Sequence, residues 1–156
     1  MRRKDREVTS SERIDEIISR CHCIRLGFCD EGEVYIVPLN FGFSKREDAR
    51  TFYFHGAKEG RKIDLMKKGQ SVGFEMDTNY KLNDGDTACD YSARFLSIIG
   101  TGHVAFVEDR AEKETALQAI MLHNTGKDDW EFSEAMVNAV CTFKMDVDTI
   151  SCKEHL

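Results

Sequence analysis

The segment from residue 53 to residue 65 holds the residue types best suited to binding an anion, and its sequence is YFHGAKEGRKIDL. Its aromatic start favours a strand that ends at His55 and Gly56. Arg61 and Lys62 then fall in the first turn of a short predicted helix. Free backbone N–H groups at a helix start attract anions, and two cations strengthen that attraction. The segment therefore predicts a phosphate site, with a solvated cationic face as the alternative.

His55 is the side chain of this segment best suited to moving a proton, because histidine exchanges protons near neutral pH. It stands at the expected end of a strand, where it is a candidate proton donor to a bound substrate. The alternative is a partly buried histidine whose ring only forms a hydrogen bond. His103 and His123 are expected to be structural or exposed.

Six cysteines offer a second kind of chemistry, and they occupy positions 21, 23, 29, 89, 141 and 152. Cys21, Cys23 and Cys29, with His22 between the first two, invite a zinc interpretation. Their C-x-C spacing has no second matched pair, unlike structural zinc sites, so no metal site is predicted. We expect reduced thiols, mostly buried as small hydrophobes, and Cys89 beside a predicted loop is the candidate for a reactive thiol.

The composition is that of an ordinary globular domain, since 41% of the 156 residues are hydrophobic and 32% are charged. One domain over residues 1–156 is expected, because a chain of this length can bury a substantial core. The net charge of −6 and the pI of about 5.4 exclude a general nucleic-acid binder, which needs a basic face. No apolar run has the length of a signal peptide or a membrane span, so we expect no membrane contact and a cytoplasmic location.

The elements that must position these residues are mostly strands. A capping box that begins at Thr9 predicts a helix over residues 10–20, and helical spacing predicts others over 61–68 and 112–123. Strands are predicted over 23–28, 34–41, 51–55, 72–77, 91–102, 103–107 and 141–147, with a turn at 100–102 and polar connections at 44–50 and 78–90. Pro38 removes a backbone donor from the second strand, so it predicts an edge or a bulge there. Because most connections are too short for parallel crossovers, we expect an antiparallel barrel or sheet of about six strands with helices outside.

Four runs of residues stand out in order along the chain: RLGF at 25–28, YIVPLNFG at 35–42, YFHGA with GRKID at 53–64, and SIIG at 97–100. Together they resemble the nitroimidazole-resistance (Nim) reductases of the pyridoxamine-phosphate-oxidase-like superfamily. The Val-Pro-Leu-Asn strand and the segment that ends in Arg-Lys carry the most specific part of this resemblance. It covers nearly the whole chain and implies a mainly β (α+β) fold, a six-stranded antiparallel split β-barrel with flanking helices that forms homodimers.

The same resemblance implies that FMN lies in a cleft between two subunits. The residues it assigns to the cofactor come from three predicted strands and one helix: Val37, Pro38, Leu39, Asn40, His55, Gly56, Arg61, Lys62 and Ser97. The Val-Pro-Leu-Asn strand would run beside the isoalloxazine ring and offer backbone groups to its polar edge. Arg61 and Lys62 would bind the phosphate, and His55 would stand beside the flavin as the catalytic residue.

The activity implied is that of a flavin-dependent reductase, in which a reduced nicotinamide loads the FMN and the FMN reduces a small acceptor such as a nitroimidazole or another nitroaromatic. FAD is the alternative flavin, and haem is the alternative cofactor. A non-catalytic flavin- or haem-binding protein is the second function considered, and a dimeric scaffold with an empty cleft is the third. Trp130, Phe132 and Tyr91 are candidates for an aromatic wall of the cleft, with ordinary core packing as the alternative. The tail at 148–156 does not resemble the substrate-binding segment of pyridoxamine-phosphate oxidases, so vitamin B6 oxidation is not expected.

Overall fold

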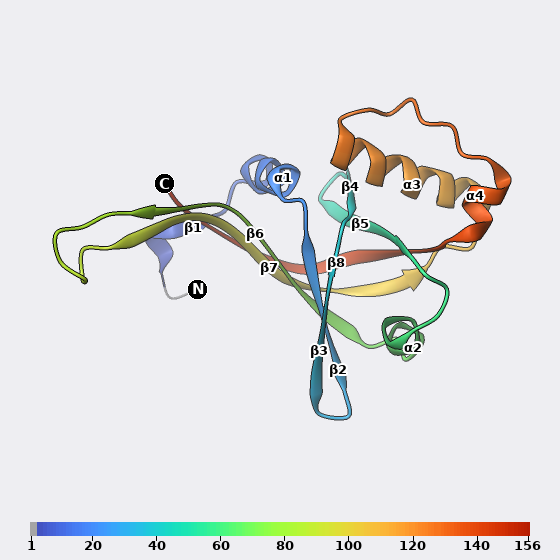
Figure 1. The fold of residues 1–156 in the computed structure, drawn as a ribbon, viewed down its shortest axis with the longest axis horizontal. Coiled ribbons are helices and arrows are strands. Elements are labelled where there is room, and N and C mark those ends of the chain that lie inside the picture. Colours follow the sequence, from blue (N-terminus) through green and yellow to red (C-terminus); the bar gives the residue numbers. More distant parts are fainter. Residues whose placement is uncertain (1–2) are drawn as a thin grey trace.

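Eight strands and four α-helices make up the part of the chain that the computed structural model describes, residues 3–156 (Figure 1). In chain order the elements are the 3₁₀ turn η1 (Lys4–Arg6), β1 (Glu7–Val8), α1 (Ser11–Arg20), β2 (Ile24–Asp30), β3 (Glu33–Leu39), β4 (Gly42–Arg46), β5 (Ala49–Gly56), α2 (Arg61–Lys67), β6 (Ser71–Asn83), β7 (Ser92–Phe106), α3 (Arg110–Thr125), α4 (Glu134–Ala139) and β8 (Cys141–His155). Residues 1–2, which open the expected domain 1–156, lie outside the described residues.

All the strands join one antiparallel sheet in the order β3-β2-β6-β7-β8-β5-β4, and β1 pairs with β8 beside this path. The sheet is not closed, because β3 and β4 stand at opposite ends of the order. In Figure 1, β6, β7 and β8 run across the molecule, α3 and α4 lie together over one end, and α2 lies below that end. The predicted fold class, a mainly antiparallel split barrel with flanking helices, is confirmed.

The predicted number of six strands is wrong, because this sheet has eight. One unforeseen strand is the short β1, and the other is β4, which replaces much of the turn predicted at 44–50. The chain reverses after β4 through Glu47, whose φ is +54°. Polar side chains are tolerated in β4 because it is an edge strand; Lys45, for example, donates from Nζ to Ser11 Oγ and Asp15 Oδ2, both at 2.8 Å. A polar edge strand lacks the apolar alternation from which sequence reasoning identifies strands.

The turn predicted at Gly100-Thr101-Gly102 is also wrong, because β7 runs through it without a break. The register against β8 shifts between Thr101 and Gly102, which marks a bulge or irregularity in the pairing. A Cβ atom on Gly100 would overlap the carbonyl oxygen of Thr149 and the ring of Phe74. These glycines therefore reflect close approach of neighbouring groups rather than a change of chain direction.

A two-stranded arm replaces the start of the loop predicted at 78–90, because β6 continues to Asn83. The arm begins at a register irregularity between Thr78 and Lys81, where Asn79 has a φ of +59°. Figure 1 shows the arm projecting away from the helices, and its Tyr80 side chain is exposed.

Two apolar clusters hold the elements together. The main core, inside the curled sheet, contains five fully buried phenylalanines at positions 28, 41, 52, 54 and 143. A second cluster joins Tyr53 of β5 to α3 and α4, and its helical members are Ala116, Leu117, Ile120 and Val137. Because side chains alternate along a strand, β5 contributes Phe52 and Phe54 to one cluster and Tyr53 to the other. Both faces of β5 are therefore buried from Phe52 to Phe54.

The helices are short and capped by side chains at three of their four starts. Ser10, one residue after the predicted Thr9, caps α1 by accepting a hydrogen bond from the Arg13 N–H at 3.2 Å. Asp109 caps α3 in the same way, and Ser133 caps α4, a helix that the sequence patterns did not predict. Among residues 3–156, no helix combines the length and the apolar character needed to cross a bilayer.

Candidate functional site

The opening of the barrel lies where β3 passes into β4. Within the described residues β3 pairs only with β2, so its other edge is free, as predicted from Pro38. The pairing of β4 with β5 starts at Gly42 opposite Tyr53, so the last residues of β5, ending at Gly56, continue beyond β4. Because only Asn40 and Phe41 separate β3 from β4, the free edge of β3 and the end of β5 lie at the same opening.

Arg61, at the start of α2, spans this opening toward β3. Its guanidinium carbon lies 4.8 Å above the centre of the Tyr35 ring, within the range of a cation–π contact. Its Nη2 also donates to Asp30 Oδ2 at 3.1 Å, at the tip of the β2–β3 hairpin. Hydrogen bonds from Lys68 and Arg61 lower the pKa of the Asp30 carboxyl. Arg61 is thus positioned at the opening but already has a carboxylate partner.

Lys62 lies on the other side of α2, beside the end of β5. A Cβ atom on Gly56 would be 3.2 Å from the Lys62 ammonium nitrogen, so this ammonium lies directly against Gly56. Lys62 forms no ion pair with any residue of the range 3–156. Of the two predicted phosphate ligands, Lys62 is therefore the one whose charge is not already compensated.

Several cations surround the same end of the sheet. Burial raises the pKa of the Cys141 thiol, which lies opposite Gly56 in β8, and four nearby lysines oppose that rise. The four lysines are Lys113, Lys62, Lys58 and Lys67. The protein carries a net charge of −6, so this gathering of positive charge is local. Such a place attracts anions although the molecule as a whole repels them.

His55 is exposed and stands one residue before Gly56, opposite Thr142 of β8. It shares a face of β5 with Tyr53, away from the main core. The structure gives its ring no hydrogen bond within residues 3–156, and this exposure does not match the alternative of a partly buried, hydrogen-bonded histidine. Thr142 is 1% exposed, and its hydroxyl has no hydrogen-bond partner in the described part of the chain. The His55 ring is free to meet a ligand at the end of β5.

The Val-Pro-Leu-Asn strand alternates between the core and the surface. Val37 and Leu39 pack against the main core, and Pro38 and Asn40 point outward. The Asn40 side chain donates to the His22 carbonyl at 3.0 Å, and to Asn124. Its amide therefore ties β3 to α1 and α3, and the free edge of β3 offers backbone groups.

Ser97 is the predicted residue that the fold does not bring to this opening. It lies on β7, paired with Asp77 of β6 and Lys153 of β8, and two strands separate β7 from β3. The other eight predicted residues lie along β3 and directly after it, at the end of β5 and at the start of α2. Trp130 and Phe132 are also elsewhere, in the loop over α3, and Tyr91 lies in the loop at the far end of the arm, directly before β7.

Sequence reasoning missed an apolar patch on the outside of the sheet, which we call the outer face. Val34 is 74% exposed, Ile36 is 60% exposed and Ile99 is 55% exposed. Between them Gly27 and Gly73 pair across β2 and β6, and a shallow cavity of about 330 Å³ lies over these glycines. The signal was available, because the run from Val34 to Leu39 is apolar at every position, which is typical of a strand covered on both faces.

The cysteines do not form a metal cluster. Cys21 is buried, and desolvation raises the pKa of its thiol to about 12. Cys29 is exposed at the other end of β2. Within residues 3–156 no three His, Cys, Asp or Glu side chains lie close enough together to hold a metal ion.

Comparison with known proteins identifies a related family and a similar solved structure. The family model described as pyridoxamine 5′-phosphate oxidase matches residues 10–154. A solved structure of a candidate 5-nitroimidazole antibiotic resistance protein from Bacteroides thetaiotaomicron is 34% identical, with a TM-score of 0.81 over 94% of this chain and 85% of that one. None of the curated proteins compared matches this chain.

Two further solved structures share the fold at lower identity. The flavocytochrome Anf3 from Azotobacter vinelandii has a TM-score of 0.80 at 18% identity, over 100% of this chain and 72% of that one. An FAD- and haem-binding protein from Mycobacterium smegmatis has a TM-score of 0.79 at 14% identity, over 96% of this chain and 73% of that one. The family match over residues 10–154 and the 34% identity together show that this chain belongs to the pyridoxamine 5′-phosphate oxidase-like family.

Proposed function

We propose that this protein is a flavin-dependent reductase that binds FMN at the opening of the barrel and reduces a small acceptor such as a nitroimidazole. The observation that carries the proposal is the uncompensated Lys62 ammonium beside Gly56, among lysines that gather at one end of an acidic protein. The similarity to the Bacteroides protein supports the acceptor class. Proteins of this fold that bind FAD and haem support the choice of a redox cofactor.

The residues at the opening fit a flavin phosphate. Lys62 would bind the phosphate directly, because its charge has no partner among the described residues. Arg61 would add a second contact once its guanidinium exchanges Asp30 for the phosphate. FMN ends in a single phosphate, which suits a site with one uncompensated cation better than the longer diphosphate of FAD.

The free edge of β3 would bind the polar edge of the flavin ring. An unpaired strand edge exposes backbone N–H and C=O groups. Pro38 has no backbone N–H, so it disfavours the pairing of another strand with the free edge of β3. Val37 and Leu39 would anchor this edge, because their side chains pack against the main core. The bound flavin supplies the electron transfer, and the chain's own residues bind and orient it.

His55 would hold the proton that the reduced acceptor needs. Reduction of a nitro group consumes protons as well as electrons, so a proton donor beside the flavin accelerates it. The exposed ring at the end of β5, one residue from Gly56, supports this role. A reduced nicotinamide is the proposed electron donor.

A second copy of the chain is the proposed cover for the outer face. Val34, Ile36 and Ile99 are too exposed to be left in water without a partner surface, and Gly27 and Gly73 allow close approach over them. A twofold dimer buries the same patch on both copies. Since one chain keeps Ser97 two strands away from β3, the partner subunit's Ser97 is the one proposed to contact the flavin.

Absorption of the purified protein and mass spectrometry of the ligand released on denaturation test the proposal. We expect flavin absorption and the mass of FMN, and anaerobic oxidation of a nicotinamide that depends on added nitroimidazole. A Soret band would identify the alternative, a haem-binding protein. A colourless protein that takes up neither FMN nor haem would refute the proposed cofactor site.

A further inference from the structure

The link between β3 and β4, residues Asn40 and Phe41, is held by one side chain in the last turn of α3. Asn124 donates from Nδ2 to the Phe41 carbonyl at 3.0 Å and to the Ile120 carbonyl of its own helix at 2.7 Å. Its Oδ1 accepts a hydrogen bond from Asn40 Nδ2 at 3.3 Å. Asn124 therefore bonds to both residues of the link while it stays fixed to its own helix.

The chemistry of the partners fixes the orientation of the Asn124 amide. Backbone carbonyls only accept hydrogen bonds, so the NH₂ group must face Phe41 and Ile120, and the oxygen then faces the Asn40 NH₂ group. An amide is the group that can donate to two carbonyls and accept from a third partner at the same time. A change at this position therefore leaves at least one of these groups without its partner.

The preceding residue of α3 holds the same link through the ring of Phe41. The ring centres of Phe41 and His123 are 4.3 Å apart, and the Phe41 ring also meets Phe52 edge-on at 5.4 Å. His123 Nε2 lies 2.7 Å from the Cys21 carbonyl, which fixes the imidazole beside the end of α1. Burial lowers the pKa of His123, so its ring packs against Phe41 as a neutral group. The side chain and the carbonyl of Phe41 are thus both restrained by α3.

These contacts restrain the end of a strand that has a neighbour on one side only. In the described part of the chain β3 pairs with β2 alone, so no second strand holds its free edge. Strand ends with few partners open locally at a low cost in free energy. A helix that holds the strand at its last residues fixes this edge in place and leaves its backbone groups uncovered.

We propose that Asn124 is a positioning residue, which fixes the free edge of β3 and through it the flavin ring bound along that edge. The inference rests on the proposed function. Asn124 acts through the link rather than by contact with the flavin. Hydrogen bonds to a flavin ring tune its electronic properties, so a displaced edge alters the absorption and the redox potential of the bound ring as well as its affinity.

The test compares Asn124→Ala with Thr125→Val, a change at the next residue of the same turn. Thr125 Oγ1 donates to the Met121 carbonyl of its own helix at 2.7 Å and makes no hydrogen bond to the link among the described residues. Release of FMN on dilution of each holoprotein gives the dissociation constant. The visible spectrum and an anaerobic titration against a redox dye then report on the flavin that stays bound.

We expect Asn124→Ala to weaken FMN binding by about tenfold, the size of effect that follows from loss of one net hydrogen bond. The ratio of the affinities for oxidised and reduced FMN should change by about threefold or more, which for a two-electron couple is about 14 mV or more. The visible bands of the bound flavin should shift as well. Thr125→Val should leave the affinity, the potential and the spectrum as in the wild type.

A purely structural role for Asn124 gives a different result. The urea midpoint would then fall while the spectrum and the potential of the remaining bound flavin stayed as in the wild type, and this outcome would overturn the proposal. If Asn124→Ala does not fold, the same measurements are made on Asn124→Leu, which keeps the branched shape of the side chain and removes its hydrogen bonds.

Failure of this inference is distinguishable from failure of the proposed function. A wild-type protein that binds no FMN would refute the proposed function and this inference with it. A wild-type protein that binds FMN, together with an Asn124→Ala variant whose flavin is the same as that of Thr125→Val, would refute this inference alone.

Discussion

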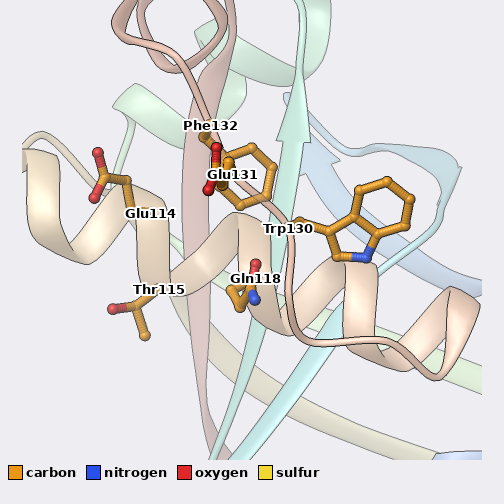
Figure 2. Close-up of a pocket in the computed structure, with 6 residues that line it drawn as sticks. All are labelled: Glu114, Thr115, Gln118, Trp130, Glu131 and Phe132. Carbon is orange, nitrogen blue, oxygen red and sulfur yellow. The ribbon is translucent and has the colours of Figure 1, made fainter.

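The opening beside α2 and the shallow cavity between α3 and the loop that follows it gather opposite charges. Lysines lie near Cys141 at the end of β5, whereas Glu114 and Glu131 line the cavity (Figure 2). The net charge of −6 of the whole protein predicts the local charge of neither site. Topology decides which charged side chains meet, and composition limits only the long-range field.

The two sites also differ in how far apart their residues lie in the sequence. The opening combines residues 37–40 with residues 55–62, and the segment 53–65 carries most of its sequence signal. The cavity is lined only by residues between 114 and 132, but no motif in that stretch indicates a site. The predictions below are chosen to affect one site and spare the other.

Removing both cations of α2 should have the largest effect. The double variant Arg61→Ala with Lys62→Ala should weaken FMN binding by about 3 kcal/mol or more, because charge-assisted hydrogen bonds contribute roughly 1.5–3 kcal/mol each. The protein should stay folded but lose FMN on dialysis. Lys62→Ala alone should account for most of the loss, since Arg61 is already bonded to Asp30. Flavin retained as tightly as in the wild type would show that the phosphate binds elsewhere.

Replacing His55 should slow chemistry and spare binding. His55→Ala should keep its FMN and slow acceptor reduction by roughly 10²-fold, a typical contribution of a general acid. Reduction of the flavin by the nicotinamide should change less. Stopped-flow measurement of the two half-reactions, normalised to flavin content, checks this. An unchanged rate of the oxidative half-reaction would show that His55 has no catalytic role.

A substitution at Gly42 should damage the α3 side selectively. A Cβ atom there would overlap backbone atoms of Ala119 and Ile120, so Gly42→Ala must move α3 away from β4. We expect a loss of about 1–3 kcal/mol of unfolding free energy in urea, the usual cost of overpacking. Gly27→Ala is the matched control, because its Cβ would meet nothing nearer than 3.8 Å. Equal destabilisation by both variants would contradict this account of how α3 is seated.

The smallest effect should come from acid titration of Asp30. Hydrogen bonds from Lys68 and Arg61 lower the pKa of this carboxyl in the folded state, so its stabilisation is complete above the ordinary value of 3.8 and is lost as the pH falls through the lowered value. Below pH 4 the urea midpoint of the wild type should therefore fall more steeply than that of Asp30→Asn. Flavin binding by the variant should not weaken, because Arg61 is released. If the urea midpoints of the wild type and of Asp30→Asn fall in parallel below pH 4, the Asp30 carboxylate does not stabilise the fold.

The sequence predicted the parts of the fold that have local signals. The hairpin of β2 and β3, helix α1 and the segment 53–65 carry turn residues, a cap or helical spacing, and the structure has each of them. The parts it missed depend on tertiary context. Gly100 looks like a turn residue until Thr149 and Phe74 are seen against it, and β4 is polar because it lies at an edge. The exposure of Ile36 likewise follows from which strand lies at the end of the sheet.

The position of β8 has a consequence for how the chain folds during synthesis. This strand lies between β7 and β5 and also bonds to β1, so it joins the beginning of the chain to its middle. Residues before position 141 can form local hairpins on the ribosome, but the two halves of the sheet stay separate until β8 has emerged. Pairing across such long sequence separations gives a high contact order, and high contact order slows folding. Until that late step the main core stays incomplete and its phenylalanines stay accessible, which makes the nascent chain prone to aggregation.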